Sequence, residues 1–277
     1  MADPEVDMTA GLLALDHQLL ELLESLQPED WLRPTVARRW NVKDVAAHLL
    51  DGNLRALSML RDGYRTPFRE TGSHEELVAY LNELNQDWVH AAGRLSPRIL
   101  IFLHQVTGPL YCSYMASLPP LDKAAFAVTW AGQTQSTNRM HIAREYTEKF
   151  LHQQQIRDAL GRKGLLNVEF YHPFLDICML ALPHTFREVR AAVGTNLSVT
   201  ISGEGGGTWW LSNSPSGSWE LCPPGTGVPE AAVEIPGTEA WKLFSKSIRA
   251  ENIKDSIVIR GDRGLALTAL DMVSFMA

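Results

Sequence analysis

The first part of the chain repeats apolar residues at intervals of three and four, the spacing of a helix that buries one face. Leucines follow this spacing in "GLLALDHQLLELLESL" and predict a helix from about Met8 to Leu26. A second helix is predicted after Trp40 in "NVKDVAAHLLDGNLRALSMLRDG", with Gly63 where a helix stop is expected. Both patterns indicate amphipathic helices that pack against neighbouring elements.

Two further helical segments complete this part of the chain. Ser73 is expected to cap a third helix, and acidic residues in the first turn of this helix favour it. The helix is expected to continue after a break at Ser96-Pro97. A long helix is predicted from about Asn138 to Leu160, where Gly161 ends it. Four principal helices with short to moderate connections predict a four-helix bundle over residues 1–163.

The pattern then changes to short strands mixed with helices. "NLSVTISG" and "TWWLSN" alternate apolar and polar residues on either side of "GEGGG", which predicts a β-hairpin, and "SWELCP", "AAVEIP" and "SIVIRG" are further candidate strands. Helices are predicted in "TEAWKLFSKSI", in "DRGLALTALDMVSFMA" with Asp262 as its cap, and in "HPFLDICMLALPHTFREVRAAVG", as one helix or two broken at Pro183. Residues 164–277 are therefore expected to form a small α/β domain, which makes the whole chain α+β with two domains.

The composition is that of a folded protein, and it narrows the class of partner. The 277 residues are 45% hydrophobic and 21% charged, with a net charge of −7. The negative charge and scattered basic residues argue against a nucleic-acid partner. The first residues lack the basic and apolar regions typical of a signal peptide, and no run approaches about 18 apolar residues, so no membrane partner is expected. Three scattered cysteines fit a reducing compartment, so we expect a cytoplasmic protein. With nucleic acid and membrane set aside, the expected partner is a small-molecule substrate. The sequence does not indicate an oligomeric state.

Candidate chemistry lies in the last helix of the predicted bundle, in "EYTEKFLHQQQ". At about 100° per residue, His141, Glu145, Glu148 and His152 fall within one narrow stripe, which Ile156 extends. A Glu–His pair four residues apart is commonly a surface ion pair, and that interpretation stays open. The apolar extension points the stripe toward a packing partner, where a carboxylate needs a cation or a metal.

A catalytic metal would need a third protein ligand, because three ligands leave one coordination position open. His48 in the second helix is the candidate, since it lies at the edge of the apolar arc that Val45 and Leu49 help to form. The alternative is a half-buried histidine that donates one hydrogen bond and binds no metal. The spacing alone does not decide between them.

The segment "RRWNVKDVAAHLLDGNLR" resembles the metal-binding helix of the mycothiol-dependent maleylpyruvate isomerase family, a branch of the DinB-like four-helix bundles. The family motif is a Trp followed by V-x-D-V-A-x-H-L, matched by Trp40 and residues 42–49, with His48 at the position of the first metal ligand. The family's other two ligands form Glu-x3-His on the last bundle helix, which Glu148 and His152 reproduce. "ALPHTFREVRAAVGTNLSVTISGEGGGTWWL" is similar to the family's second domain, an α/β module related to sterol carrier proteins.

The resemblance implies a DinB-like metal-binding bundle followed by a sterol-carrier-like domain, with a metal held by His48, Glu148 and His152. Two histidines and one carboxylate suit Zn²⁺ first, with Ni²⁺ as a second choice and Fe²⁺ or Mn²⁺ also compatible. It further implies a low-molecular-weight thiol such as mycothiol as cofactor. The expected activity is that of a maleylpyruvate-isomerase-like cis–trans isomerase or a thiol S-transferase.

Some residues and functions stay open at this point. Glu145 and His141 lie one turn or more from the ligands, so they are candidates for hydrogen bonds to those ligands; the alternative is that they only solvate the helix. Arg249, Arg260 and Arg263 are candidates for holding a dicarboxylate substrate, and the favoured alternative for each taken singly is a salt bridge on a solvated surface. A non-catalytic carrier of a lipid or other small molecule, or a hydrolase whose metal activates water, are the alternatives.

Overall fold

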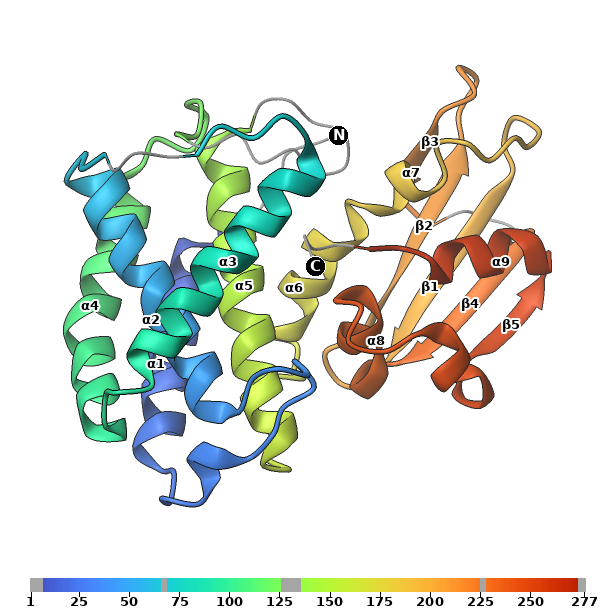
Figure 1. Ribbon diagram of the computed structural model, residues 1–277. Helices are drawn as coiled ribbons and strands as arrows, with labels where there is room; N and C mark the ends of the chain where they lie inside the picture. Colours follow the sequence, from blue (N-terminus) through green and yellow to red (C-terminus); the bar gives the residue numbers. More distant parts are fainter. Residues whose placement is uncertain (1–6, 66–68, 126–135, 225–227, 274–277) are drawn as a thin grey trace. The chain divides into compact units, whose positions relative to one another are not determined.

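The computed structural model describes residues 7–65, 69–125, 136–224 and 228–273. Within them the chain forms two compact units, a helical unit up to Lys163 and a mixed unit from Gly164 (Figure 1). The helical-plus-mixed architecture confirms the α+β class expected from the sequence.

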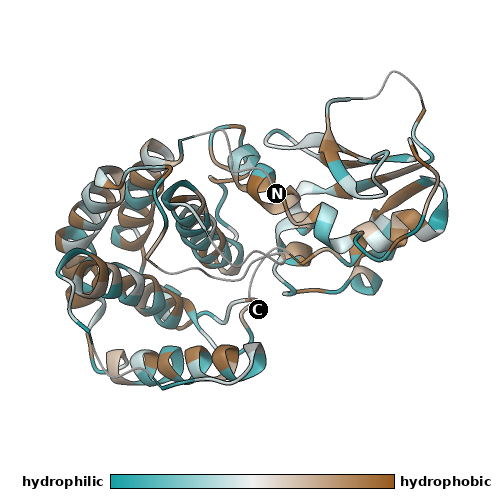
Figure 2. Ribbon diagram, turned by 90° about the horizontal axis from the view of Figure 1, so that it is seen from above, coloured by the Kyte–Doolittle hydropathy of each residue, from teal (hydrophilic) through white to brown (hydrophobic). Residues whose placement is uncertain are grey.

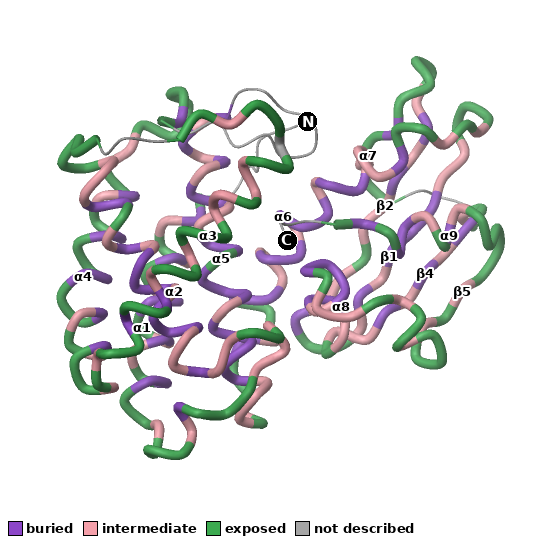
Figure 3. Tube along the Cα trace, viewed as in Figure 1, coloured by how far each residue is buried: buried purple, intermediate pink, exposed green. Residues whose placement is uncertain are grey.

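The helical unit is built from long helices that follow the predicted amphipathic segments. α1, α2, α4 and α5 pack as a bundle, in which α1 and α2 each contact both α4 and α5, while α3 packs on α2. Figure 2 shows hydrophobic and hydrophilic faces on these helices, and Figure 3 shows buried positions along them. The helices are α1 Thr9–Glu24, α2 Val42–Arg55, α3 His74–Ala92, α4 Pro97–Ser117 and α5 Asn138–Ala159, with short turns at Asp30–Leu32 (η1) and Ala56–Arg61 (η2, a π-helix).

The helix ends agree with the predicted caps and correct one expectation. Ser73 accepts a hydrogen bond from the Glu76 amide and caps α3, as expected, and Gly63 and Gly161 have positive φ angles at the predicted stops. Ser96 caps α4 in its own right, so α3 and α4 are two separate helices and not one interrupted helix. The described part of the helical unit therefore has five long helices where four were expected.

An apolar core joins the helices of this unit. Leucines of α1 and the alanine-rich inner face of α2 meet here, and the small side chains allow the helices to approach closely. Its buried members are Leu19, Leu22, Leu23, Trp31, Val42, Val45, Ala46, Ala47, Leu49, Leu50, Ala92, Leu100 and Ile156.

A buried polar cluster also crosses the bundle. The Lys149 ammonium of α5 donates to Asp16 Oδ1 of α1 and to Asn53 Oδ1 of α2, both at 3.0 Å. Asn53 Nδ2 donates in turn to the Thr107 hydroxyl of α4 at 3.3 Å. The cluster thus ties together all four helices of the bundle, and its partners offset the cost of burying charge.

The mixed unit contains a five-stranded sheet in the order β3-β2-β1-β4-β5. β1 and β2 form the predicted antiparallel hairpin, β1 pairs with β4 in parallel, and the outer pairs are antiparallel. All the strands expected from the sequence are present. They are β1 Asn196–Ser202, β2 Gly207–Asn213, β3 Trp219–Cys222, β4 Ala231–Pro236 and β5 Val258–Gly261.

The helices of this unit match the sequence less closely than the strands. α8 (Gly237–Phe244) and α9 (Arg263–Leu270) pack on β4 and β1, and Asp262 caps α9 as expected. The segment with Pro183 forms two helices, α6 (Tyr171–Met179) and α7 (Leu182–Thr185), because Pro183 lacks the amide needed to continue α6. None of the described helices is both long and apolar enough to cross a membrane.

The expected helix "FREVRAAVG" after α7 is wrong. Backbone carbonyls of this segment instead accept hydrogen bonds from side chains of the sheet. Trp219 Nε1 of β3 donates to the Val189 carbonyl at 2.9 Å, and Asn213 Nδ2 of β2 donates to the Ala191 carbonyl at 2.7 Å. Residues 186–195 therefore lack regular helix, and two side chains distant in sequence determine their path.

Candidate metal centre

Helix α2 carries His48 on a segment that is fixed at its start and along its length. Asn41 and Asp44 form a reciprocal capping box at the N-terminus of α2. Trp88 Nε1 of α3 donates to the Ala47 carbonyl at 2.8 Å, and His104 Nε2 of α4 bonds the Ala46 carbonyl at 2.9 Å. Two neighbouring helices thus hold the backbone next to His48, which sets the direction of its ring.

Helix α5 presents the other two candidate ligands toward α2. Thr137 caps α5, and the buried Phe150 and Gln153 anchor the helix, with Gln153 Nε2 donating to the Leu15 carbonyl of α1 at 3.0 Å. The helical period places Glu148 and His152 one turn apart on one face. Their side chains therefore lie opposite α2.

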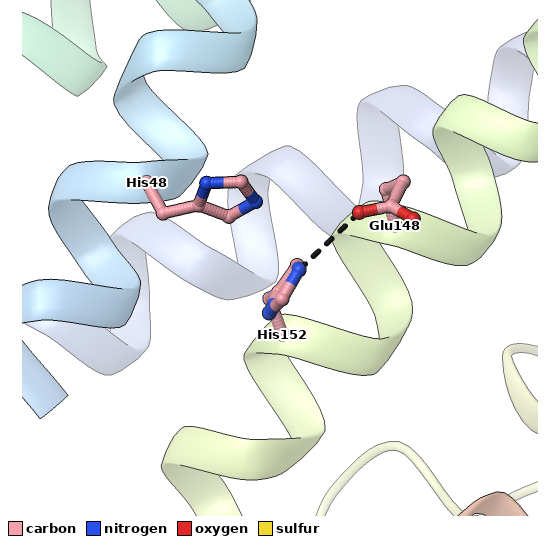
Figure 4. A group of neighbouring side chains, drawn as sticks. All are labelled: His48, Glu148 and His152. Atoms are coloured by element: carbon pink, nitrogen blue, oxygen red, sulfur yellow. Dashed lines mark ion pairs between the residues drawn. The ribbon is translucent and has the colours of Figure 1, made fainter. Parts of the chain in front are cut away.

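The structure brings His48, Glu148 and His152 together. One ligand atom from each lies within 4.8 Å of the other two. His152 Nε2 is 3.2 Å from Glu148 Oε2, and the two histidine rings meet edge to face with centroids 4.6 Å apart. Figure 4 shows the side chains from α2 and α5 pointing toward one another. Small side-chain adjustments would suffice for all three to contact one ion.

Hydrogen bonding at His152 leaves two acceptors facing each other. His152 Nδ1 lies 2.9 Å from Gln155 Oε1, and an Nδ1–H donating to this oxygen leaves the lone pair on Nε2. Nε2 then faces the Glu148 carboxylate at 3.2 Å. Two acceptors at this distance need a proton or a cation between them, which is the chemistry of a metal site.

Trp40 lines one side of the group. Its ring lies 4.8 Å from the His48 ring and 6.2 Å from the His152 ring, measured between centroids. An indole at this distance restricts both imidazoles and excludes water from that side. His48 Nδ1 is buried and has no hydrogen-bond partner within the described chain, so packing rather than hydrogen bonding fixes its ring.

The electrostatics favour the protonation states that bind metals. Burial, together with the neighbouring His152, lowers the pKa of His48 to about 3, so its ring is neutral at physiological pH. Burial opposes ionisation of Glu148, but a proton on His152 Nε2, in the place that a metal ion would take, outweighs burial and lowers the pKa of this carboxyl. The Glu148 side chain is still 47% exposed, which leaves the group open to a ligand. A neutral imidazole and a carboxylate are the forms that coordinate a divalent ion.

The structure does not bring Glu145 and His141 to the candidate ligands. Glu145 Oε2 accepts a hydrogen bond from the Tyr111 hydroxyl at 2.6 Å, and His141 Nδ1 lies 3.5 Å from Arg144 Nη2. Gln155 takes the supporting position instead. Its signal in the sequence was the three-residue spacing from His152, which places two side chains on one helix face.

The arginines considered for substrate binding all lie in the mixed unit. Arg249 precedes a short turn at Ala250–Asn252 (η3), Arg260 is on β5 opposite Ala232, and Arg263 begins α9. The helical unit has an arginine near the candidate ligands that the sequence did not single out, Arg55 of α2.

Comparisons with known proteins agree with this architecture. The family model of the mycothiol maleylpyruvate isomerase N-terminal domain matches residues 12–157. The solved structure of a mycothiol-dependent maleylpyruvate isomerase is 12% identical, covers 91% of this chain and 92% of its own, and has a TM-score of 0.51; its point mutant has a TM-score of 0.53.

Two other comparisons add less. A sterol carrier protein domain 2 from Helicoverpa armigera is 18% identical over 38% of this chain and 87% of its own, with a TM-score of only 0.29. No curated protein matches the chain significantly. The family model spans more than half of the chain and includes His48, Glu148 and His152. The chain therefore belongs to the mycothiol maleylpyruvate isomerase N-terminal domain family.

Proposed function

We propose that the chain is an enzyme that binds a divalent metal ion through His48, Glu148 and His152 and uses it to activate a low-molecular-weight thiol. The observation that carries the proposal is the convergence of three ligand atoms within 4.8 Å, with two acceptors facing each other at 3.2 Å. Zinc fits two imidazoles and one carboxylate best, and nickel is the second choice. Three protein ligands leave a position for a small molecule.

The chemistry of such a site follows from its open position. A bound divalent ion would supply Lewis acidity that lowers the pKa of a thiol, so that the thiol is a thiolate at neutral pH. The surrounding residues prepare the three ligands for the ion. Gln155 keeps the proton of His152 on Nδ1, burial lowers the pKa of His48 and keeps its ring neutral, and Trp40 shields one side of the candidate metal site from water. The half-exposed Glu148 side chain marks the side from which a ligand enters.

We infer a small-molecule substrate with an electrophilic carbon. The structural relative is named as a mycothiol-dependent maleylpyruvate isomerase, which supports mycothiol as the thiol and a conjugated cis double bond as its target. In an isomerase the thiolate sulfur adds to the double bond, rotation follows about the resulting single bond, and the same C–S bond then breaks. In an S-transferase the C–S bond stays, and the electrophile either loses its leaving group or, after addition to a double bond, takes up a proton on the neighbouring carbon.

Metal content is the first test. Purified protein should hold about one equivalent of zinc or nickel, and the His48→Ala variant should lose it, because one of the three protein ligands is gone. His17→Ala, an exposed histidine of α1, is the matched control and should keep the metal. Metal-free protein after reconstitution would contradict the proposal and favour a carrier.

Thiol binding is the second test. Metal-loaded protein should release about one proton per mycothiol bound at neutral pH, and should then isomerise maleylpyruvate or transfer the thiol to an electrophile. Turnover that is independent of thiol and instead consumes water would identify a hydrolase. Retained metal without thiol binding or turnover would contradict the thiol chemistry while leaving the metal site intact.

A further inference from the structure

Helix α4 exposes apolar side chains on the face that points away from the bundle. Its inner face is already in use, since Leu100 and Met115 are buried against the other helices. Four residues of the outer face are about half exposed: Ile99 (45%), Phe102 (56%), Val106 (47%) and Leu110 (47%). Their spacing of three and four residues puts them on one stripe, which we call the outer stripe. α4 lies at the edge of the helical unit (Figure 1), and Figure 3 shows exposed positions along it.

The outer face of α4 differs from that of a solvated helix. Among the 21 residues of α4, Arg98 alone is a lysine, arginine or acid. Helix α3 provides the contrast, because its exposed positions include the acids Glu75, Glu76, Glu83 and Asp87. A helix that is apolar on all sides is normally covered on all sides. The outer stripe is therefore expected to be covered in solution.

The order of side chains along the outer stripe makes it complementary to a second copy of itself. The spacing is three, four and four residues from one end, and four, four and three from the other. In an antiparallel pair centred between residues 104 and 105, Ile99 faces Leu110 of the second copy. Near the centre, the large Phe102 ring meets the smaller Val106 side chain of the second copy, and the two-fold symmetry repeats this contact. Large side chains packed against small ones fill the space between two helices well.

The charges beside the outer stripe favour a second copy over a membrane surface. Helix α1 packs against α4 and exposes Glu21 and Glu24, and Gln105 Nε2 of α4 donates to Glu24 Oε1 at 2.7 Å. Apolar helix faces that bind anionic membranes are flanked by basic residues, whereas these flanking residues are acidic. In a pair of copies the acids lie at the rim, where water and salt screen their repulsion.

We propose that two copies of the chain associate through the outer stripes of α4, packed antiparallel, as a weak homodimer. Four half-exposed side chains offer roughly 300–400 Å² of apolar surface per copy. A standard protein interface buries about 800 Å² per partner, so the dissociation constant is expected to be on the order of 10 µM. This association does not depend on the metal or the thiol.

Sedimentation equilibrium of the full-length protein is the first test. Between about 1 and 200 µM, the average mass should rise from that of a monomer toward that of a dimer. Val106→Glu should stay monomeric over this range, because the pair would bury two carboxylates without partners. Leu84→Glu, at an exposed position of α3, is the matched control and should still dimerise. A monomeric wild-type protein at about 200 µM, or a dimer that survives in Val106→Glu, overturns the proposal.

Disulfide cross-linking tests the antiparallel arrangement and needs no disruptive variant. Along the helix axis, Val106 lies about 2 Å from the centre of the pair and Leu110 about 8 Å from it. In a Cys222→Ser background, which removes the half-buried native thiol, Val106→Cys should cross-link to its own copy on mild oxidation. Leu110→Cys should not, because its two sulfurs are too far apart. Equal cross-linking of both variants indicates a parallel pair and overturns the arrangement; cross-linking of neither, in a protein that dimerises, overturns the interface.

Discussion

Two polar groups in the bundle begin at neighbouring residues of α5, yet they have opposite character. Lys149 points inward, where Asp16 and Asn53 accept its hydrogen bonds and the Tyr111 ring lies 4.7 Å from its ammonium. Glu148 points to the other side, where its carboxylate faces an imidazole acceptor and its side chain is half exposed. One residue of helical rotation, about 100°, separates the two groups. We call Lys149, Asp16, Asn53 and Thr107 the closed cluster, and His48, Glu148 and His152 the open group.

The difference shows which polar group is structural. In the closed cluster the partners come from three other helices, so removing one member leaves a buried charge without compensation. Asp16 Oδ2 and His48 Nδ1 both lack a partner within the described chain, so the difference lies elsewhere: Asp16 has its counter-ion, while Glu148 of the open group faces a lone pair. Such a group contributes little to folding and needs an added cation to be satisfied, as expected of a binding site.

The largest expected effect comes from breaking the closed cluster. Lys149→Met should lower the free energy of unfolding by about 3–5 kcal/mol, because Asp16 would stay buried without its counter-ion. Chemical denaturation of metal-free protein measures this. Lys163→Met, at an exposed lysine, is the control and should change stability by less than about 0.5 kcal/mol.

A double variant tells charge burial apart from lost packing. Asp16→Leu combined with Lys149→Met replaces the pair by apolar side chains and should recover most of the loss, since buried ion pairs are often replaceable in this way. If the double variant is as unstable as Lys149→Met, the cluster stabilises the bundle through its geometry and not through charge compensation.

Local sequence signals predicted the elements and the face of α5 that carries the ligands. Caps such as Ser73 and Asp262 and the spacing of Glu148 and His152 depend on nearby residues only, so the pattern suffices. The closed cluster was missed because a lysine in a polar helix gives no sign that Asp16, 133 residues away, will meet it. The same holds for residues 186–195, where Asn213 and Trp219 use the backbone.

Gly108 tests how closely α4 packs against Asp16 of the closed cluster. A Cβ at this position of α4 would overlap the Asp16 carboxylate, which Lys149 holds in place. Gly108→Ala should therefore destabilise the protein by about 1–3 kcal/mol, despite the better helix propensity of alanine. Gly52→Ala on α2 has open space at its Cβ and should be neutral or stabilising by up to about 1 kcal/mol. Equal effects in the two variants would contradict the close packing of Asp16 on Gly108.

Gln155 tests the open group without removing a ligand. Gln155→Leu keeps the volume but removes the acceptor for His152 Nδ1, so metal affinity should fall about tenfold, with little change in the stability of metal-free protein. Competition with a chelator measures the affinity. Gln154→Leu changes the adjacent buried glutamine, whose Oε1 has no hydrogen-bond partner within the described chain, and should leave metal affinity unchanged. A tenfold loss in both variants would indicate a general effect on α5.

The smallest effect concerns His104, which joins α4 to α2 next to His48. Burial lowers the pKa of His104 from 6.5 to about 4, so the unfolded chain takes up a proton between these values before the folded protein does. Its stabilising contribution is thus complete above pH 6.5 and is lost as the pH falls toward 4, with a slope of at most about 1.4 kcal/mol per pH unit. His104→Leu should flatten the pH dependence of unfolding of the metal-free protein. Leu100→Ala, at a buried neighbour, should lower stability at every pH and keep the slope; an unchanged slope in His104→Leu would mean that this histidine does not stay neutral in the folded bundle.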